Sequence, residues 1–301
     1  MARLPDAFTV HDARAWGVDD RRLRSRREWQ HPYRGIRAAP DARWIDTVGV
    51  RVRAAGTAAF LFGPSALRAW GLELPGRRGA DDGAGADADV HIAVPRPGRA
   101  PRGQGILGYS VGIDDVCVTR LRGIRITTRA RTWVDLARWI GMRDLVAVGD
   151  RLCLPEEDLC SQSELETALA LSPRVRGAAS LRSALALVVP GAESYPESQI
   201  RVSCELAGLP RPLVNAVVRD GREPVARVDL LFERWGVIVE YEGAHHALDQ
   251  RQWRRDLTRI GELQRLGYIV ERAHADDLRD PTRLVSRIRT HLLRRGWTAG
   301  G

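Results

Sequence analysis

The stretch from Arg227 to His246, R-V-D-L-L-F-E-R-W-G-V-I-V-E-Y-E-G-A-H-H, sets the fold of the C-terminal part of this chain. Its hydrophobic side chains alternate with polar ones in two runs, Val225 to Phe232 and Gly236 to Glu242. Alternation with a period of two is typical of β-strands, so the sequence predicts two strands joined by a short turn. In the first strand, one face is expected to carry Ala226, Val228, Leu230 and Phe232, and the other Arg227 and Asp229.

The register of this hairpin predicts an unusual pair of carboxylates. If Arg234-Trp235 is a two-residue loop, counting back from it places Asp229 opposite Glu240. Directly opposed residues lie about 4.5 to 5.5 Å apart at Cβ, and like charges at that distance destabilise the ladder. A divalent cation between the two carboxylates would remove the repulsion, and hard oxygen ligands favour Mg²⁺ or Mn²⁺.

The flanking sequence predicts a mixed layer of helices and strands around this hairpin. Apolar periodicity, Ser and Asp caps and glycine stops predict the order helix, strand, strand, strand, helix, strand, helix. The elements outside the hairpin are expected at Ser194 to Ala207 (helix), Leu213 to Val218 (strand), Asp249 to Leu266 (helix) and Tyr268 to Arg272 (strand).

This order and these residues resemble the PD-(D/E)xK nuclease superfamily. More narrowly, they resemble the family called domain of unknown function 559, which is related to the very-short-patch-repair endonucleases. The resemblance covers about Ser194 to Leu293 and rests on Glu197, Asp229, the run Glu240-Tyr-Glu242-Gly243-Ala-His-His246, and Asp256, Arg259, Leu263, Gly267 and Arg272.

The resemblance implies a metal-dependent hydrolysis of phosphodiesters. In it, Asp229 and Glu240 hold Mg²⁺ (or Mn²⁺), and Glu197 orients a water or a second metal. The chain has no lysine, so its 47 basic side chains are all arginine, and Glu242 occupies the place of the family's lysine. Arginine stays protonated and cannot act as a base. His246 is therefore the expected general base, because imidazole titrates near neutrality.

Each of these residues also has a structural interpretation. Glu197 completes a capping box with Ser194, and Glu242 pairs with Arg227 across the hairpin. Asp229 and Glu240 are also consistent with a solvated sheet face, and His245 with a loop histidine. Asp256 and Arg259 are consistent with a surface ion pair as well as with substrate contacts.

The N-terminal residues predict a winged helix. Thr9 to Asp12 has the spacing of a capping box and opens a helix that runs to Trp16, and Asp19 caps a second helix from Asp20 to Glu28. Trp29 to Arg37 is expected to form a small hairpin. A basic second helix followed by a β-wing is the arrangement of proteins that place a helix in the major groove.

The basic side chains of this segment are the expected DNA ligands. From Asp19 to Arg37 there are seven arginines and three acidic residues, and the expected contacts are Arg21, Arg22, Arg24, Arg26, Arg27 and Arg34. Trp16-Gly-Val, the basic helix and Tyr33-Arg-Gly-Ile resemble the N-terminal domain of AbiEi-type antitoxins. The structural interpretation is a solvated arginine face on an ordinary helical hairpin.

The predicted fold class is α/β (α+β overall), with a winged helix-turn-helix, an α+β middle region and a restriction-endonuclease-like α/β domain with a central mixed sheet. The expected boundaries are 1–50, 51–155, a helical linker at 156–192, and 193–297. In the middle region, Thr132 and Asp135 have capping-box spacing at the start of a helix. We find no catalytic constellation in that region.

The bulk properties are consistent with a nucleic-acid partner. A formal charge of +9 and a pI near 10.3 favour polyanions, although an arginine-only composition is also typical of a high-GC genome. Four cysteines without CxxC spacing argue against zinc, and we expect reduced thiols and a cytoplasmic location. No apolar run predicts a membrane span or a signal peptide.

Two functional classes follow from the sequence. The first is a metal-dependent DNA endonuclease targeted by its own winged helix. The second is a non-catalytic DNA-binding regulator or antitoxin-like protein that retains a nuclease fold. The expected partner is DNA, with no membrane, and a homodimer or a protein partner (if the chain is antitoxin-like) stays open.

Overall fold

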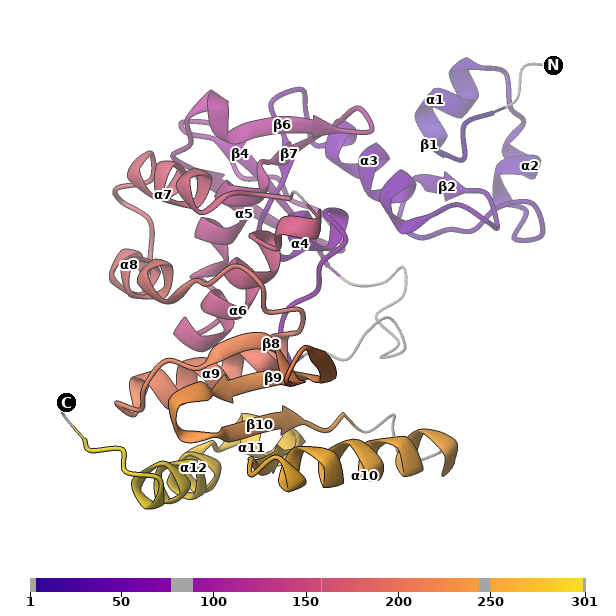
Figure 1. Cartoon of the computed structure of the whole chain (residues 1–301). Coiled ribbons are helices and arrows are strands. Elements are labelled where there is room, and N and C mark those ends of the chain that lie inside the picture. Colours follow the sequence, from indigo (N-terminus) through magenta and orange to yellow (C-terminus); the bar gives the residue numbers. More distant parts are fainter. Residues whose placement is uncertain (1–3, 77–88, 158, 244–249, 300–301) are drawn as a thin grey trace. The chain divides into compact units, whose positions relative to one another are not determined.

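The computed structural model of this chain describes residues 4–76, 89–157, 159–243 and 250–299, with the main chain alone at 156 and 250–257. The mixed α+β class is confirmed: helices accompany three sheets of two, four and five strands. The chain divides into two compact units (Figure 1). One is Met1–Trp139 with Ser163–Ala178, and the other is Ile140–Gln162 with Ala179–Gly301.

The first unit begins with a small helical subdomain. Its elements are β1 (Ala7–Thr9), α1 (Val10–Ala15), α2 (Asp20–Arg24) and β2 (Ile36–Ala38), and β1 pairs antiparallel with β2. Thr9 and Asp19 cap the two helices as expected, since the Thr9 hydroxyl accepts from the Asp12 N–H and the Asp19 carboxylate from the Arg21 N–H. Phe8, Ala13, Leu23 and Trp29 form the core of this subdomain.

Two expectations about the subdomain are wrong. The second helix ends at Arg24 and not at Glu28, and Ile36–Ala38 pairs mainly with β1 rather than within a local hairpin. A single bridge between Gln30 and Ala38 closes the intervening loop. The reason is tertiary: Trp29 is buried against Phe8 with ring centroids 4.9 Å apart, so the chain leaves the helix to bring Trp29 into the core.

The rest of the first unit is a five-stranded sheet with helices, in the strand order β5-β4-β3-β7-β6. The helix α4 has Pro64 in its first turn, and β6 and β7 form an antiparallel hairpin. The elements of this part are α3 (Trp44–Ala54), β3 (Phe60–Leu61), α4 (Gly63–Ala69), β4 (Val90–Pro95), β5 (Ile106–Val111), β6 (Val118–Leu121), β7 (Ile124–Thr127), α5 (Arg129–Leu136) and α7 (Gln162–Ala170).

The start of α5 differs from the expected capping box. The N-cap is Thr128, whose hydroxyl accepts from the Arg131 N–H at 3.2 Å. Thr132 bonds instead to the Thr128 carbonyl at 2.8 Å, and Asp135 forms a buried ion pair with Arg131 at 2.9 Å. Two consecutive threonines precede this helix, and burial of the Arg131–Asp135 pair selects the earlier start.

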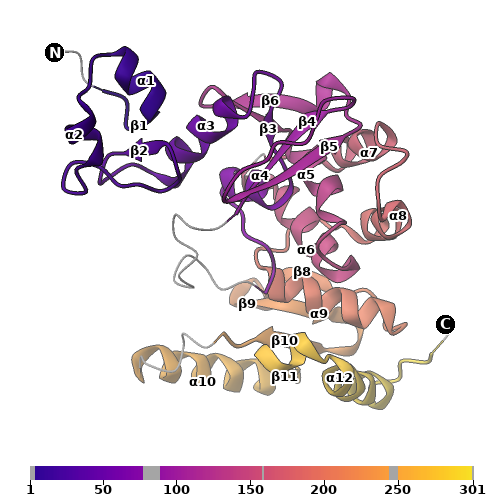
Figure 2. The same ribbon diagram turned by 180° about the vertical axis from the view of Figure 1, so that it is seen from behind.

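The second unit is a four-stranded sheet in the order β11-β10-β9-β8, with β8, β9 and β10 antiparallel and β11 parallel to β10. The expected order of elements is confirmed through β11, after which two helices follow (Figure 2). The elements are α6 (Met142–Leu152), α8 (Ala178–Leu187), α9 (Tyr195–Leu206), β8 (Leu213–Asp220), β9 (Glu223–Phe232), β10 (Val237–Tyr241), α10 (Gln250–Arg265), β11 (Ile269–Ala273), α11 (Ala275–Arg279) and α12 (Thr282–Arg294).

The register of β9 and β10 agrees with the expected one. Val237 pairs with Phe232 and Val239 with Leu230, so the same count places Glu240 opposite Asp229. The connection is longer than the expected two residues: Glu233–Trp235 forms a 3₁₀ turn, and Gly236 closes it with φ of +60°. The register is unchanged because the turn takes residues from both strands equally.

The strict alternation expected for β9 is wrong at one point. Leu230 packs with Ile200 and Cys204 of α9, whereas Val228, two residues earlier, packs with Leu263 of α10. The two clusters lie on opposite faces of the sheet, so the face of the strand changes between these residues. The neighbouring strand is irregular at the same level, where Asn215 has φ of +51°. A residue in the left-handed region interrupts the pleat that makes side chains alternate.

Candidate functional site

Asp229 lies where the β9–β10 ladder ends. Its carboxylate Oδ2 accepts a hydrogen bond from the main-chain N–H of Tyr241 at 2.8 Å, so the side chain takes a donor that a main-chain carbonyl would otherwise take. Burial raises the pKa of this carboxyl, and the Tyr241 N–H and the charge of Arg259 oppose the rise. Asp229 also lies between Val228 and Leu230, whose side chains pack on opposite faces of the sheet. Charged groups on both faces therefore affect the pKa of Asp229.

Glu240 lies on β10, and the guanidinium of Arg259 already contacts its carboxylate. Its Oε2 accepts from Nη2 of Arg259, on α10, at 2.6 Å, and only 13% of the Glu240 side chain is exposed. Arg259 Nη1 also donates to the carbonyl of Arg227 at 3.3 Å. The sequence was consistent with Arg259 in a surface ion pair or in a substrate contact. In the structure it pairs with Glu240, and its charge acts on Asp229.

Glu197 lies in the first turn of α9, and three donors hold its carboxylate. Ser194 caps α9, and its hydroxyl donates to Glu197 Oε1 at 2.6 Å, while the N–H of Glu193 donates to Oε2 at 3.1 Å. Asn215 of β8 also donates to Oε2, at 2.9 Å. The pKa of Glu197 is raised by burial first and by the charge of Asp229 as well. It is therefore a helix cap that lies within electrostatic reach of Asp229.

Glu242 has partners other than the expected one. It forms ion pairs with Arg272 and, at 3.6 Å, with Nδ1 of His274, beyond the end of β11. The expected pair with Arg227 is wrong, because Arg227 binds Glu193. The Glu242 N–H donates to the Ala273 carbonyl at 2.8 Å, which holds this residue to β11 rather than to β9.

His245 and His246 lie outside the described residues, as do the Asp249 cap and the side chain of Asp256. Within the described part of the chain, no group of three or more His, Cys, Asp or Glu side chains is arranged to hold a metal ion. The charges of Asp229 and Glu197 thus act on each other, and the β9–β10 register, continued one step beyond its last pair Val239–Leu230, places Glu240 opposite Asp229.

Sequence reasoning missed Asn215. Its side chain links Glu197 to the Gly191 carbonyl, which accepts from Nδ2 at 2.7 Å, and its backbone makes the irregularity opposite Asp229. One signal was present: asparagine, which tolerates positive φ better than most residues, stood in the middle of a predicted strand.

The basic side chains expected to contact DNA differ in how they are engaged. Arg22 pairs with Glu28 at 2.6 Å and is half-buried. The other five are exposed, and none has a carboxylate ion pair among the residues described: Arg21, Arg24, Arg26, Arg27 and Arg34. Arg37, which the sequence did not single out, is held by the Leu23 carbonyl at 2.5 Å.

Comparison with known proteins gives relatives without a described function. No family model matches the chain. The chain is 31% identical over 174 residues to "Uncharacterized protein MT2308" of Mycobacterium tuberculosis strain CDC 1551 / Oshkosh, a match that covers 58% of this chain and 64% of the relative. "Uncharacterized protein Rv2248" of strain H37Rv matches to the same extent. The match therefore spans just under two thirds of the length of these curated relatives.

One solved structure is similar in outline. "Crystal structure of RV2827C protein from Mycobacterium tuberculosis" aligns with a TM-score of 0.38 and 18% identity, over 72% of this chain and 84% of that chain. A likeness at this level carries no argument about fold or function.

Two further observations concern the expected absence of a membrane span and the expected reduced thiols. None of the described helices is both long and apolar enough for a membrane span. The four cysteines are free, with Cys117, Cys153 and Cys204 buried and Cys160 half-buried.

Proposed function

We propose that this chain is a DNA-binding protein whose second unit is a metal-dependent endonuclease that hydrolyses DNA phosphodiesters. The observation that carries the proposal is the meeting of Asp229 with Glu240 by register and with Glu197 by charge. Carboxylates placed so that one raises the pKa of another are costly to the fold, and such groups cluster at functional sites.

The order of elements also supports this proposal. The sequence α9, β8, β9, β10, α10, β11, with β11 parallel to β10, is the order that the resemblance to PD-(D/E)xK nucleases implies. In that resemblance Asp229 lies on the second strand and Glu240 on the third.

The donor atoms suit the proposed metal. Asp229 and Glu240 offer hard carboxylate oxygens, which Mg²⁺ and Mn²⁺ prefer, and Glu240 already binds a cationic group in Arg259. The two carboxylates would hold the ion after Arg259 leaves Glu240. When bound, Mg²⁺ or Mn²⁺ would act as a Lewis acid and lower the pKa of a coordinated water.

The residues of the chain would then have distinct roles. The Tyr241 N–H fixes the orientation of the Asp229 carboxylate. Glu197, held by Ser194 and Asn215, stays in one rotamer and keeps negative charge beside Asp229. Arg259, once released from Glu240, is placed to bind a phosphate oxygen, because guanidinium groups match phosphate geometry. The proposed general base, His246, lies outside the described residues.

DNA binding is proposed for the first unit. The exposed Arg21, Arg24, Arg26, Arg27 and Arg34, without carboxylate ion pairs among the described residues, are free to approach phosphates. Contacts of this kind release counterions from DNA, and they position a protein on the duplex without reading its sequence. The short α2 is better suited to backbone contact than to lying along the major groove as a long recognition helix.

A second candidate function has its own support. Glu240 pairs with Arg259, and Glu242 pairs with Arg272 and lies 3.6 Å from Nδ1 of His274, so both of these carboxylates already have basic partners. Such pairing, together with the absence of lysine from the chain, favours a DNA-binding regulator or antitoxin-like protein that retains the fold without catalysis.

The test is nicking of supercoiled plasmid with Mg²⁺ or Mn²⁺. Asp229→Asn and Glu240→Gln should each lower the rate at least about 100-fold, since each removes a proposed metal ligand. Asp220→Asn is the matched control, because Asp220 lies at the end of β8 in the same sheet and pairs with Arg265 on the surface.

Equal nicking by the wild type and all three variants would mean a contaminating nuclease and would refute the assignment. Absence of nicking in the wild type, combined with tight and salt-sensitive duplex binding, would favour the regulator.

A further inference from the structure

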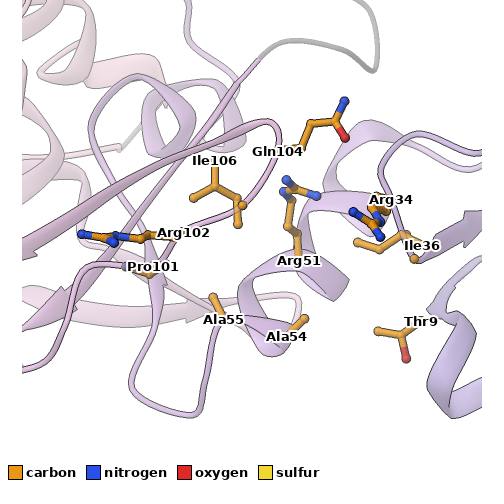
Figure 3. A pocket seen from close by; sticks show the side chains of 12 residues that line it. Thr9, Arg34, Ile36, Arg51, Ala54, Ala55, Pro101, Arg102, Gln104 and Ile106 are labelled. Carbon is orange, nitrogen blue, oxygen red and sulfur yellow. The ribbon is translucent and has the colours of Figure 1, made fainter.

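The first unit contains a cleft of about 690 Å³ (Figure 3), and Arg34 is the one residue of its lining that also belongs to the proposed DNA surface. Four segments line it: the end of β1, the loop before β2 with the start of that strand, the C-terminal half of α3, and the loop before β5. Its polar lining consists of three arginines, a threonine and a glutamine, with no carboxylate: Arg34, Arg51, Arg102, Thr9 and Gln104. A volume of this size is in the range of small-molecule sites, about 300 to 1,000 Å³.

Arg51 is the central observation. It lies on α3, and only 6% of its surface is exposed. Its guanidinium stacks on the ring of Tyr33 at 4.1 Å, and its Nε is buried without a hydrogen-bond partner in the described part of the chain. No carboxylate within ion-pair distance accompanies it there; Asp89 acts on it only through longer-range charge. Burial of a charge without a partner is costly, so this guanidinium is suited to an anionic ligand.

The surroundings hold Arg51 in place for such an anion. Tyr33 is buried beneath it, and Gly105 approaches so closely that a Cβ there would lie 3.4 Å from Arg51 Nη2 and 3.4 Å from the Tyr33 ring. Gly105 also has φ of +68°, a conformation that favours glycine. The loop before β5 is thus packed on the Tyr33–Arg51 stack.

The other groups converge on the same space. Figure 3 shows the Arg51 guanidinium rising from α3 toward Gln104, with Arg34 on the loop before β2 and Ile106 on the opposite wall; Arg102 points away from Arg51. Arg34 is exposed and has no ion pair among the described residues. The floor and walls carry the apolar side chains Ile36, Ala54, Ala55 and Ile106.

We propose that this cleft binds the phosphate of a nucleotide, with Arg51 and Arg34 as its anion ligands. Guanidinium groups bind phosphate oxygens in pairs of parallel hydrogen bonds, and the apolar wall suits the sugar and base that a nucleotide carries. The phosphate belongs either to a free nucleotide or to a nucleic-acid backbone. The site is independent of the carboxylates of the second unit, and stands whether or not those are catalytic.

The test is binding by the full chain, measured by isothermal titration calorimetry in metal-free buffer with AMP, with adenosine, and with a 16-base-pair duplex. Wild type is compared with Arg34→Ala and Arg51→Gln. Arg182→Ala is the matched control, because Arg182 is an exposed arginine of α8 in the other unit. Circular dichroism checks the fold of Arg51→Gln, and if that variant does not fold, Arg34→Ala decides.

Saturable binding of AMP but not of adenosine, weakened about tenfold or more by either cleft variant and not by Arg182→Ala, would support a free nucleotide as the source. A loss of affinity confined to the duplex would support a backbone phosphate. In that case each cleft variant should reduce the slope of log K against log salt concentration by about 0.9, and Arg182→Ala should leave the slope unchanged.

The proposal is overturned if neither AMP nor duplex binding distinguishes the cleft variants from Arg182→Ala. Because no arm requires Mg²⁺ or cleavage, a failure of the nuclease proposal leaves this result unaffected. Equally, nicking activity without any effect of Arg34→Ala or Arg51→Gln on binding would leave the nuclease proposal for the second unit standing and refute this one.

Discussion

Asp150 and Asp229 are two aspartates of the second unit whose pKa is raised by burial, yet their surroundings differ. Asp150, on α6, accepts from the Val189 N–H, the Ser198 hydroxyl and Arg201 Nη2, each at 2.7 Å. Asp229 accepts from one main-chain N–H, the charge of Glu193 helps to raise its pKa, and its own charge helps to raise the pKa of Glu197.

This difference distinguishes buried charges whose partners stabilise the fold from buried charges that are available to bind a ligand. Asp150 and Arg201 are both fully buried and form an ion pair, with Glu205 as a second carboxylate partner of Arg201, so this network joins α6 to α9 although Arg201 Nε has no hydrogen-bond partner among the described residues. Buried arginines show the same contrast, because Arg51 in the first unit has no such acceptor in the described residues. Satisfied groups are structural, whereas incompletely partnered ones point to a binding site.

The largest effect should come from breaking the satisfied network. Asp150→Ala leaves the Arg201 guanidinium buried without this partner, and removing one member of a buried pair costs about 3 to 5 kcal/mol. We expect the free energy of unfolding, measured with urea, to fall by that amount. Asp229→Asn should change it by less than about 1 kcal/mol, because an amide still accepts from Tyr241 N–H. Equal losses in the two variants would show that the two aspartates do not differ in this way.

The next effect concerns the cation on Glu240. Arg259→Gln should tighten Mg²⁺ binding about tenfold, which is about 1.4 kcal/mol, because the ion no longer competes with the guanidinium. The measurement is the Mg²⁺ dependence of the melting temperature. Arg265→Gln is the control, since Arg265 lies on the same helix and pairs with Asp220 away from the site. Weaker Mg²⁺ binding in Arg259→Gln would contradict a metal site at Glu240.

A third effect is the pH dependence of stability. Burial raises the pKa of Asp229, so between its unfolded and folded values the native state binds more protons than the unfolded chain. The contribution of Asp229 to stability is therefore present at low pH and is lost as pH rises through the raised pKa. Asp229→Asn should flatten this part of the metal-free profile, because the amide does not titrate.

Mg²⁺ reverses the sign, because the ion binds the deprotonated carboxylate. The stabilisation that Mg²⁺ adds to the wild type should grow with pH over the same range and be absent from Asp229→Asn. A metal-free profile that Asp229→Asn leaves unaltered would show that this carboxyl titrates normally.

The smallest effect lies on the arginine surface. Arg26→Ala should reduce the slope of log K against log salt concentration for duplex binding by about 0.9, because one phosphate contact and its released counterion are lost. The free energy of unfolding should change by no more than about 0.5 kcal/mol. Arg22→Ala should change it less, because Glu28 already engages Arg22. Fluorescence anisotropy across a salt series measures both slopes. The reverse ranking would place the DNA contact at Arg22 on α2 rather than at Arg26 beyond the end of this helix.

Local sequence was sufficient for the order of elements from α9 to β11 and for the register of the β9–β10 hairpin, but not for the end of α2 or for the pairing of β2. The alternation from Val225 and the glycine at Gly236 were enough to place Asp229 opposite Glu240, because periodicity and turn chemistry are local. Helix caps at Thr9, Asp19 and Ser194 were likewise readable, since a cap depends on residues within one turn.

The partners of the charged side chains could be identified only from the tertiary structure. The pairing of Glu242 with Arg272, the contact of Arg259 with Glu240, and the change of face at Asp229 depend on packing between segments far apart in the sequence. The isolation of Arg51 on Tyr33 likewise depends on a loop that arrives more than fifty residues later, at Gly105. A periodic pattern gives the face of a helix or strand, but the partner of a buried charge is set by whichever elements are packed against that face.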